Sequence, residues 1–228
     1  MTHPSGHGVP EWALMRRHFS DVRLRLYLTE AGGDEDAAAH LYQWNSHCSA
    51  AFWEALGYLE VSLRNALDAR MTLRQQARGG TRHWVFDDAR QLGRDARGHG
   101  RHAHPYQNVA TAIRRVQANG KPLDPAQIIS ELPFGFWHQL VARRQMFLWP
   151  DLAAAFVHAP TRSPVPVRDR LARMRVLRNR IGHHHRIWSL DLDSRWDDLL
   201  TLTGWIDPEL RTWVETSTGV PAALDARP

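Results

Sequence analysis

The chain has 228 residues, of which 43% are hydrophobic and 23% are charged, and its formal net charge is +5. These proportions exclude a disordered or collagen-like chain, and the length favours one globular domain. No apolar run approaches the roughly 20 residues that span a bilayer, and the first residues do not resemble a signal peptide, so we expect neither a membrane protein nor a secreted one. The single cysteine, Cys48, cannot form an internal disulfide, which indicates a reducing compartment and a cytoplasmic protein.

Apolar side chains recur at intervals of three and four residues over most of the chain, which predicts an almost entirely helical protein. The first predicted helix covers 20–29, with Ser20 as its cap and two glycines behind it. A long helix follows over about 34–73. Asn45 and Ser46 mark a point at which this helix can bend, because both side chains compete for backbone hydrogen bonds.

The segment over 75–105 has a different composition, rich in Gly, Arg and His. Only the stretch Trp84-Val85-Phe86 offers an apolar anchor, so we expect a long flexible insertion with room for one short packed element. A metal site formed by His99, His102 and His104 is the less favoured interpretation, because the flanking glycines hold none of these rings in place.

Further helices are predicted in the rest of the chain, separated by glycine and proline. They are expected over 105–120, 124–129, 132–148, around Phe156, and over 167–184, 194–205 and 207–214. Residues 216–228 are interpreted as a frayed tail. No alternating strand pattern stands out, so the expected fold is a single all-α domain over 1–228, with the ten tryptophans as core anchors.

Basic residues gather on the helix predicted over 167–184. Between Arg168 and Arg186 the chain has seven arginines and one acid, Asp169, so this short stretch carries six net positive charges on an otherwise nearly neutral protein. Such a concentration is typical of a phosphate-binding surface. An exposed helix face that happens to be rich in arginine is the alternative.

The end of this helix combines groups that suit RNA cleavage. On a helical wheel Asn179 and His183 share the face opposite the apolar stripe, while Arg178 and His184 flank that stripe on its two sides. A histidine with an ordinary pKa of about 6.5 exchanges a proton at neutral pH, and a guanidinium matches phosphate oxygens with forked donors. A base that removes the ribose 2′-OH proton and an arginine that stabilises charge on the phosphate form a minimal kit for cleavage without a metal.

The segment from Arg178 to His183, with a polar residue directly after the arginine, resembles the R-x4-6-H motif of HEPN-domain ribonucleases. The wider pattern is similar to the Abi-like (abortive infection, AbiD/AbiF type) family, and the matching segments occur in family order over roughly 20–214. These segments are 41–45, 51–56, 59–66, 132–137 and 177–184. The resemblance implies an all-α, HEPN-like helical bundle with additional helices and the long insertion, RNA as substrate, no cofactor or metal, and a role in bacterial phage defence.

The resemblance also implies roles for particular residues. Arg178 would stabilise the phosphate and the transition state, and His183 would be the general base or acid. Asn179 would orient the histidine or the RNA backbone, and His184 is the second candidate base. Supporting or RNA-binding positions are Arg175, Arg180, Arg186, Glu60 and Arg64. For Glu60 and Arg64 the alternative is a plain ion pair, because the two residues are four positions apart on one predicted helix.

A homodimer is the expected assembly. HEPN ribonucleases commonly work as dimers, and Arg178 and His183 lie about 140° apart on one ideal helix, so each arginine would meet the histidine of the partner chain. One departure from the family pattern stands beside the motif: the family continues with Glu-Pro after the paired histidines, whereas this chain has His185-Arg186, which replaces an acid by positive charge.

Two other interpretations stay open. One is a non-catalytic RNA-binding or scaffolding HEPN module. The other is a metal site formed by His183, His184 and His185, which is disfavoured because consecutive helical side chains point about 100° apart. A small neutralising protein or an RNA partner is an open possibility for regulation, and no membrane partner is expected.

Overall fold

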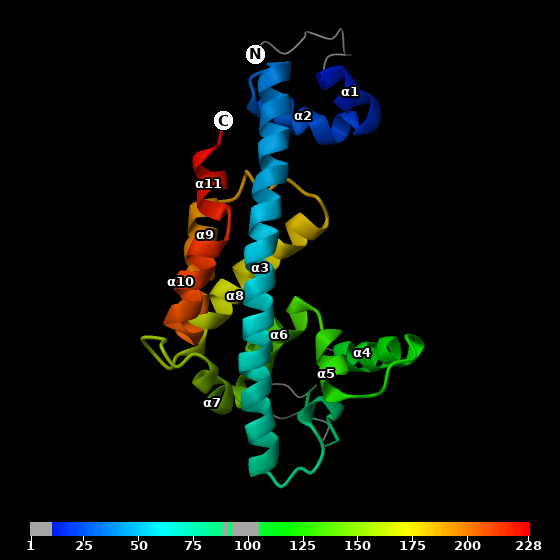
Figure 1. Cartoon of the computed structure of the whole chain (residues 1–228), viewed down its shortest axis with the longest axis vertical. Helices are drawn as coiled ribbons and strands as arrows, with labels where there is room; N and C mark the ends of the chain where they lie inside the picture. The colour runs from blue at the N-terminus through cyan, green and yellow to red at the C-terminus, as the bar shows by residue number, and fades with distance from the viewer. Residues whose placement is uncertain (1–10, 89–90, 93–104) are drawn as a thin grey trace.

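The computed structural model describes residues 11–88, 91–92 and 105–228. Within these ranges the chain forms α-helices and short 3-10 helices and no strand, which confirms the predicted all-α class (Figure 1). The α-helices are α1 (Glu11–His18), α2 (Asp21–Glu30), α3 (Glu35–Ala77), α4 (Tyr106–Ala118), α5 (Pro125–Ser130), α6 (Phe134–Leu140), α7 (Trp149–Leu152), α8 (Pro164–Gly182), α9 (Leu192–Ile206), α10 (Pro208–Ser217) and α11 (Val220–Asp225). The 3-10 helices are Trp84–Phe86, Arg143–Leu148 and Ala153–Ala155. No helix in the described ranges is both long and apolar enough to cross a bilayer.

The long helix α3 is the axis of the molecule (Figure 1). It has 43 residues, so at 1.5 Å per residue it extends over about 65 Å. Asp34 caps its start by accepting a hydrogen bond from the Ala37 backbone N–H at 3.0 Å. Helices α1 and α2 pack at one end of α3, α8, α9 and α11 pack along it, and α6 and α7 pack towards its other end.

The possible bend of this helix at Asn45 and Ser46 does not occur, because α3 is continuous through both residues. The Asn45 side chain is 6% exposed and makes its hydrogen bonds outside the helix, to the backbone after α8. Ser46 donates to the Tyr42 carbonyl oxygen at 3.1 Å, a bond that a helix tolerates. Neither side chain therefore takes a donor or acceptor away from the helix.

Helix α8 crosses α3 near the middle of its length and packs on α3, α6 and α9 (Figure 1). Its predicted apolar stripe is buried, with Leu171, Met174 and Leu177 all at 0% exposure. The helix starts three residues earlier than expected, because Ser163 caps it and Pro164 is tolerated in the first turn. It ends at Gly182, two residues before the predicted end.

The helix predicted over 132–148 is wrong in its length. α6 ends at Leu140, where the last turns tighten to i+3 bonds from the Val141 and Ala142 N–H groups. Ala142 then adopts extended backbone (φ −73°, ψ 160°), and a separate 3-10 helix follows.

The expected frayed tail is also wrong, because α10 continues to Ser217 and α11 packs on α3 and α9. Val220 is fully buried there, and the Trp44 indole N–H donates to the Ala223 carbonyl oxygen at 2.7 Å. These long-range contacts hold a segment whose own sequence has little apolar periodicity.

Part of the expected insertion over 75–105 is ordered. Helix α3 continues to Ala77. Trp84 and Val85 are buried in the 3-10 helix Trp84–Phe86, which is the short packed element that the sequence allowed at this apolar stretch. The Trp84 indole N–H donates to Asp68 on α3 at 2.6 Å. Residues 89–90 and 93–104, which include the histidines at 99, 102 and 104, lie outside the described residues.

Candidate functional site

Helix α8 ends in a geometry that glycine usually supplies. His183 is the C-cap, and His184 follows with φ +54°, in the left-handed region. The His184 N–H donates to the Ile181 carbonyl oxygen at 2.8 Å, and the His185 N–H donates to the Arg180 carbonyl oxygen at 2.7 Å. These two bonds form a Schellman motif. A residue with a Cβ costs about 1 kcal/mol more than glycine in this conformation, so the surrounding structure holds His184 there.

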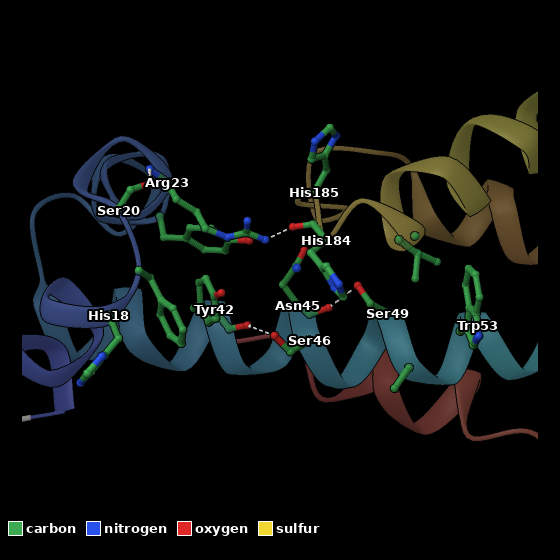
Figure 2. Close-up of a pocket in the computed structure, with 15 residues that line it drawn as sticks. His18, Ser20, Arg23, Tyr42, Asn45, Ser46, Ser49, Trp53, His184 and His185 are labelled. Carbon is green, nitrogen blue, oxygen red and sulfur yellow. Dashed lines mark hydrogen bonds between the residues drawn. The ribbon is translucent and has the colours of Figure 1, made fainter.

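Contacts from two other helices fix this turn. Arg23 on α2 donates from its guanidinium to the His184 carbonyl oxygen (Figure 2). Asn45 on α3 accepts from the Ile187 N–H at 2.7 Å and from the Trp188 N–H at 3.3 Å. Since buried backbone donors without partners destabilise a fold, Asn45 sets the path of the chain directly after the histidines.

A pocket of about 810 Å³ lies between this turn, α2 and α3 (Figure 2). Its aromatic lining residues are Phe19, Tyr27, Tyr42 and Trp53. Its basic and imidazole lining residues are Arg23, His18, His184 and His185. No acidic residue lines it, so the pocket favours a ligand that has both an apolar part and negative charge.

A second pocket of about 350 Å³ adjoins the first and shares Arg23, Tyr27, His184 and His185 with it. It adds Arg180 and Arg186, and again no carboxylate lines it. The Arg180 guanidinium donates to the Arg186 carbonyl oxygen at 3.0 Å, which brings the two arginines to one wall. Several guanidinium groups without a counter-charge in a concave surface are suited to phosphate.

The three consecutive histidines have different surroundings. The His184 ring projects toward α3 between Asn45 and Ser49, whereas His185 points away from α3 (Figure 2). His183 is exposed and lines neither pocket, and its ring centroid is 5.8 Å from that of His185. In the described part of the chain, no group of three or more His, Cys, Asp or Glu side chains is arranged to hold a metal ion.

Arg178 lies on the α3 side of α8. Its guanidinium carbon is 5.1 Å from the centroid of the Trp53 ring, a cation–π contact. A Cβ added to Gly182 would lie 3.6 Å from Arg178 Nη1 and within 4 Å of Trp53, so these groups pack around the last turn. Trp53 is 45% exposed, unlike a core anchor, and it also lines the larger pocket. Arg178 is therefore joined to the pocket through this indole.

Glu60 on α3 connects Arg178 to two further elements. Burial raises the pKa of Glu60, while the guanidinium groups of Arg178 and Arg64 and a hydrogen bond from the Phe134 backbone N–H lower it. Phe134 is the first residue of α6. Glu60 therefore links α3 to α6 and α8. Its interactions extend beyond the i,i+4 pair with Arg64.

Several arginines of α8 serve helix packing and not an open phosphate-binding surface. Arg173 donates through two nitrogens, each 2.6 Å from an oxygen of Asp198 on α9. Arg170 and Arg195 lie 3.4 and 3.3 Å from the same carboxylate, which is 5% exposed. Arg168 is paired with Asp169 at 3.0 Å. The basic character predicted for the whole helix is thus confined to its C-terminal half.

The predicted site residues fall into three groups in space. The pockets are lined by His184, Arg180 and Arg186. The exposed outer face of α8 carries Arg175, Asn179 and His183. The α3 side holds Arg178, Glu60 and Arg64. Among the described residues, no hydrogen bond, ion pair or ring contact joins Arg178 to His183.

Sequence reasoning missed most of the residues that line the pockets, among them Arg23, Tyr42, Asn45 and Trp53. Tyr42, Asn45 and Trp53 lie within the segments on which the family resemblance rests, so a signal for them was present. Arg23 had none, because its partner His184 is 161 positions away.

Comparison of the chain with known protein families, curated proteins and solved structures finds no match. The resemblance to the Abi-like family therefore stays a prediction.

Proposed function

We propose that the chain is a metal-independent endoribonuclease that binds RNA at the C-terminal end of α8. The observation that carries the proposal is the convergence of Arg23, Arg180 and Arg186 with two imidazoles around adjoining pockets that no carboxylate lines. A concave surface of this charge attracts a phosphodiester backbone.

The chemistry follows from the groups at this end of the helix. An imidazole removes the ribose 2′-OH proton, the 2′ oxygen attacks the adjacent phosphorus, and the 5′ oxygen leaves with a proton from a second acid. Arg178 stabilises the negative charge that builds on the phosphate oxygens. The products are a 2′,3′-cyclic phosphate and a 5′-hydroxyl end.

Two histidines are candidates for proton transfer. His184 reaches the pocket from its own chain. His183 is exposed on the outer face of α8, and Arg178 lies on the α3 side, so a site that uses both needs a second copy of the chain. We therefore include a homodimer in the proposal, with each Arg178 facing the His183 of the partner.

Cleavage of single-stranded RNA in excess EDTA tests the nuclease. The proposal expects cyclic phosphate ends and loss of cleavage in R178A, and in H183A or H184A, whichever histidine transfers the proton. The matched control is R25A, because Arg25 is an exposed arginine of α2 that lines neither pocket. Wild-type protein that leaves RNA intact in EDTA refutes the proposal.

Mixing R178A with H183A tests the shared site. Statistical exchange of subunits restores one intact site in each mixed dimer, so about a quarter of wild-type activity returns if the site spans two chains. If each chain carries its own site with His184 as the base, H183A cleaves RNA by itself, and the mixture shows no more than the activity that the H183A chains contribute.

A non-catalytic RNA-binding module is the second candidate. It is favoured by the absence of a contact between Arg178 and His183 within the described residues of one chain. This candidate expects salt-dependent RNA affinity without cleavage, weakened stepwise by R180Q and R186Q. A place in phage defence, implied only by the resemblance, stays a prediction.

A further inference from the structure

The larger pocket has a volume of about 810 Å³, within the range of pockets that hold small organic ligands. It shares four lining residues with the smaller basic pocket, so these residues lie at the junction of the two pockets. A purely apolar ligand would desolvate two imidazoles and the remaining donors of Arg23 without offering them partners, which is unfavourable. The ligand must therefore combine an apolar body with an anionic group.

Aromatic rings stand at both ends of the pocket. Phe19 stacks on Tyr42, with ring centroids 5.3 Å apart and an interplanar angle of 12°, and Phe19 is 40% exposed. Tyr42 and Trp53 lie at opposite ends of one stretch of α3 (Figure 2). Exposed aromatic faces in a basic groove are the surfaces on which nucleobases stack.

The helix between these rings presents hydrogen-bond acceptors. Ser46 donates its hydroxyl proton to the Tyr42 carbonyl oxygen at 3.1 Å, and Ser49 donates to the Asn45 carbonyl oxygen at 2.6 Å. Each hydroxyl has one proton, so both oxygens can only accept from a ligand. Exocyclic amino groups of a base and ribose hydroxyls are donors of the matching kind.

We infer that the two adjoining pockets form a subsite for one nucleotide, with its base in the aromatic pocket and its phosphate at Arg180 and Arg186. Arg23 and His184 lie at the junction, where Arg23 adds a third guanidinium to the phosphate end and His184 lies beside the sugar. The identification of this nucleotide as part of an RNA chain rests on the proposed function. A free mononucleotide offers the same base, sugar and phosphate groups.

Titration calorimetry at low salt tests the base and phosphate contributions with four probes: 5′-AMP, adenosine, ribose 5-phosphate and inorganic phosphate. AMP is expected to bind at least about 10-fold more tightly than ribose 5-phosphate, because stacking of a base on an aromatic side chain is worth that factor. Equal affinity of AMP, ribose 5-phosphate and inorganic phosphate overturns the inference.

Variants of the aromatic end locate the base. F19A is expected to weaken AMP about 10-fold and to leave ribose 5-phosphate unchanged. A50F fills the pocket from an exposed position of α3, so it should abolish AMP binding without disturbing the core. The control is Y106A, because Tyr106 is 50% exposed on α4 and lines neither pocket. AMP binding that survives both F19A and A50F refutes the assignment.

A variant at the junction locates the phosphate. R23Q is expected to weaken AMP and inorganic phosphate by a similar factor and to leave adenosine unchanged, which also shows that the pocket is intact. R25Q, on the same helix, should change none of these affinities. A loss of adenosine and AMP together in R23Q contradicts a phosphate contact.

Two further measurements distinguish an RNA chain from a free nucleotide as the ligand, and test the subsite independently of the nuclease proposal. A 2′-O-methyl dinucleotide that binds more tightly than AMP assigns the subsite to an RNA chain, and equal affinity assigns it to a free nucleotide. If AMP binds as expected and RNA is never cleaved, the subsite stands and the nuclease proposal falls. If A50F cleaves RNA normally and the base adds nothing to affinity, the nuclease stands and the subsite falls.

Discussion

Replacing His184 by glycine relieves a backbone conformation that costs a side chain free energy. His184 has φ +54° at the Schellman position after α8, and its side chain is exposed, so the substitution removes little packing. Relief of the left-handed conformation is worth about 1–2 kcal/mol, and the greater freedom of glycine in the unfolded chain offsets about 0.5–1 kcal/mol of it. We expect H184G to raise the free energy of unfolding by about 0.5–1 kcal/mol.

Denaturant unfolding and thermal melting measure this difference. For a chain of this size a gain of about 1 kcal/mol raises Tm by about 2–4 °C. H184A keeps the Cβ and should gain nothing, while H184V, with a branched Cβ, should lose about 1–2 kcal/mol. The order glycine, histidine or alanine, then valine is the signature of backbone strain.

The same variants separate stability from function. If His184 is kept in this conformation because its imidazole faces the pocket, H184G gains stability and loses RNA cleavage or nucleotide affinity. A valine variant as stable as the glycine variant refutes the reasoning, since strain would then be absent.

Three further predictions concern packing and pH. N45A leaves two backbone N–H groups of the chain after α8 without their acceptor and should destabilise the fold by about 1–3 kcal/mol in urea unfolding, whereas N45D keeps an acceptor and should lose less. D198N removes the carboxylate shared by three arginines and should cost about 2–3 kcal/mol, below the range for fully buried pairs because the arginines are partly exposed; a change under 0.5 kcal/mol contradicts a structural role for this cluster. Burial, with the nearby guanidinium groups of Arg175 and Arg168, lowers the pKa of His138 to about 4. Between pH 6.5 and 4 the His138 side chain is therefore protonated in the unfolded chain and neutral in the folded chain. Stability should therefore fall as pH drops through this window, by up to about 1 kcal/mol per pH unit, and H138L should flatten that part of the urea-unfolding profile.

Much of the helical architecture is determined locally. Ser20, Asp34 and Asp124 each cap the helix that the sequence predicts after them, and the apolar stripe of α8 is the one that is buried. These features follow from the sequence because caps and i,i+4 periodicity involve neighbours in the chain. The apolar spacing likewise places residues 178–184 at the end of one helix, whereas the motif roles of these residues rest on the family resemblance.

Tertiary structure alone decided which of these groups lie together. Asp198 on α9 forms ion pairs with Arg170 and Arg173. From the sequence alone these two arginines were expected to belong to a phosphate-binding surface. Arg23 on α2 is 161 positions from His184 in the chain, yet its guanidinium donates to the His184 carbonyl oxygen. Tyr42 and Trp53 of α3 line the pocket beside this contact. The direction of a side chain relative to other helices depends on how those helices cross, and no local pattern encodes that crossing; the pockets at the end of α8 therefore became visible only in the folded chain.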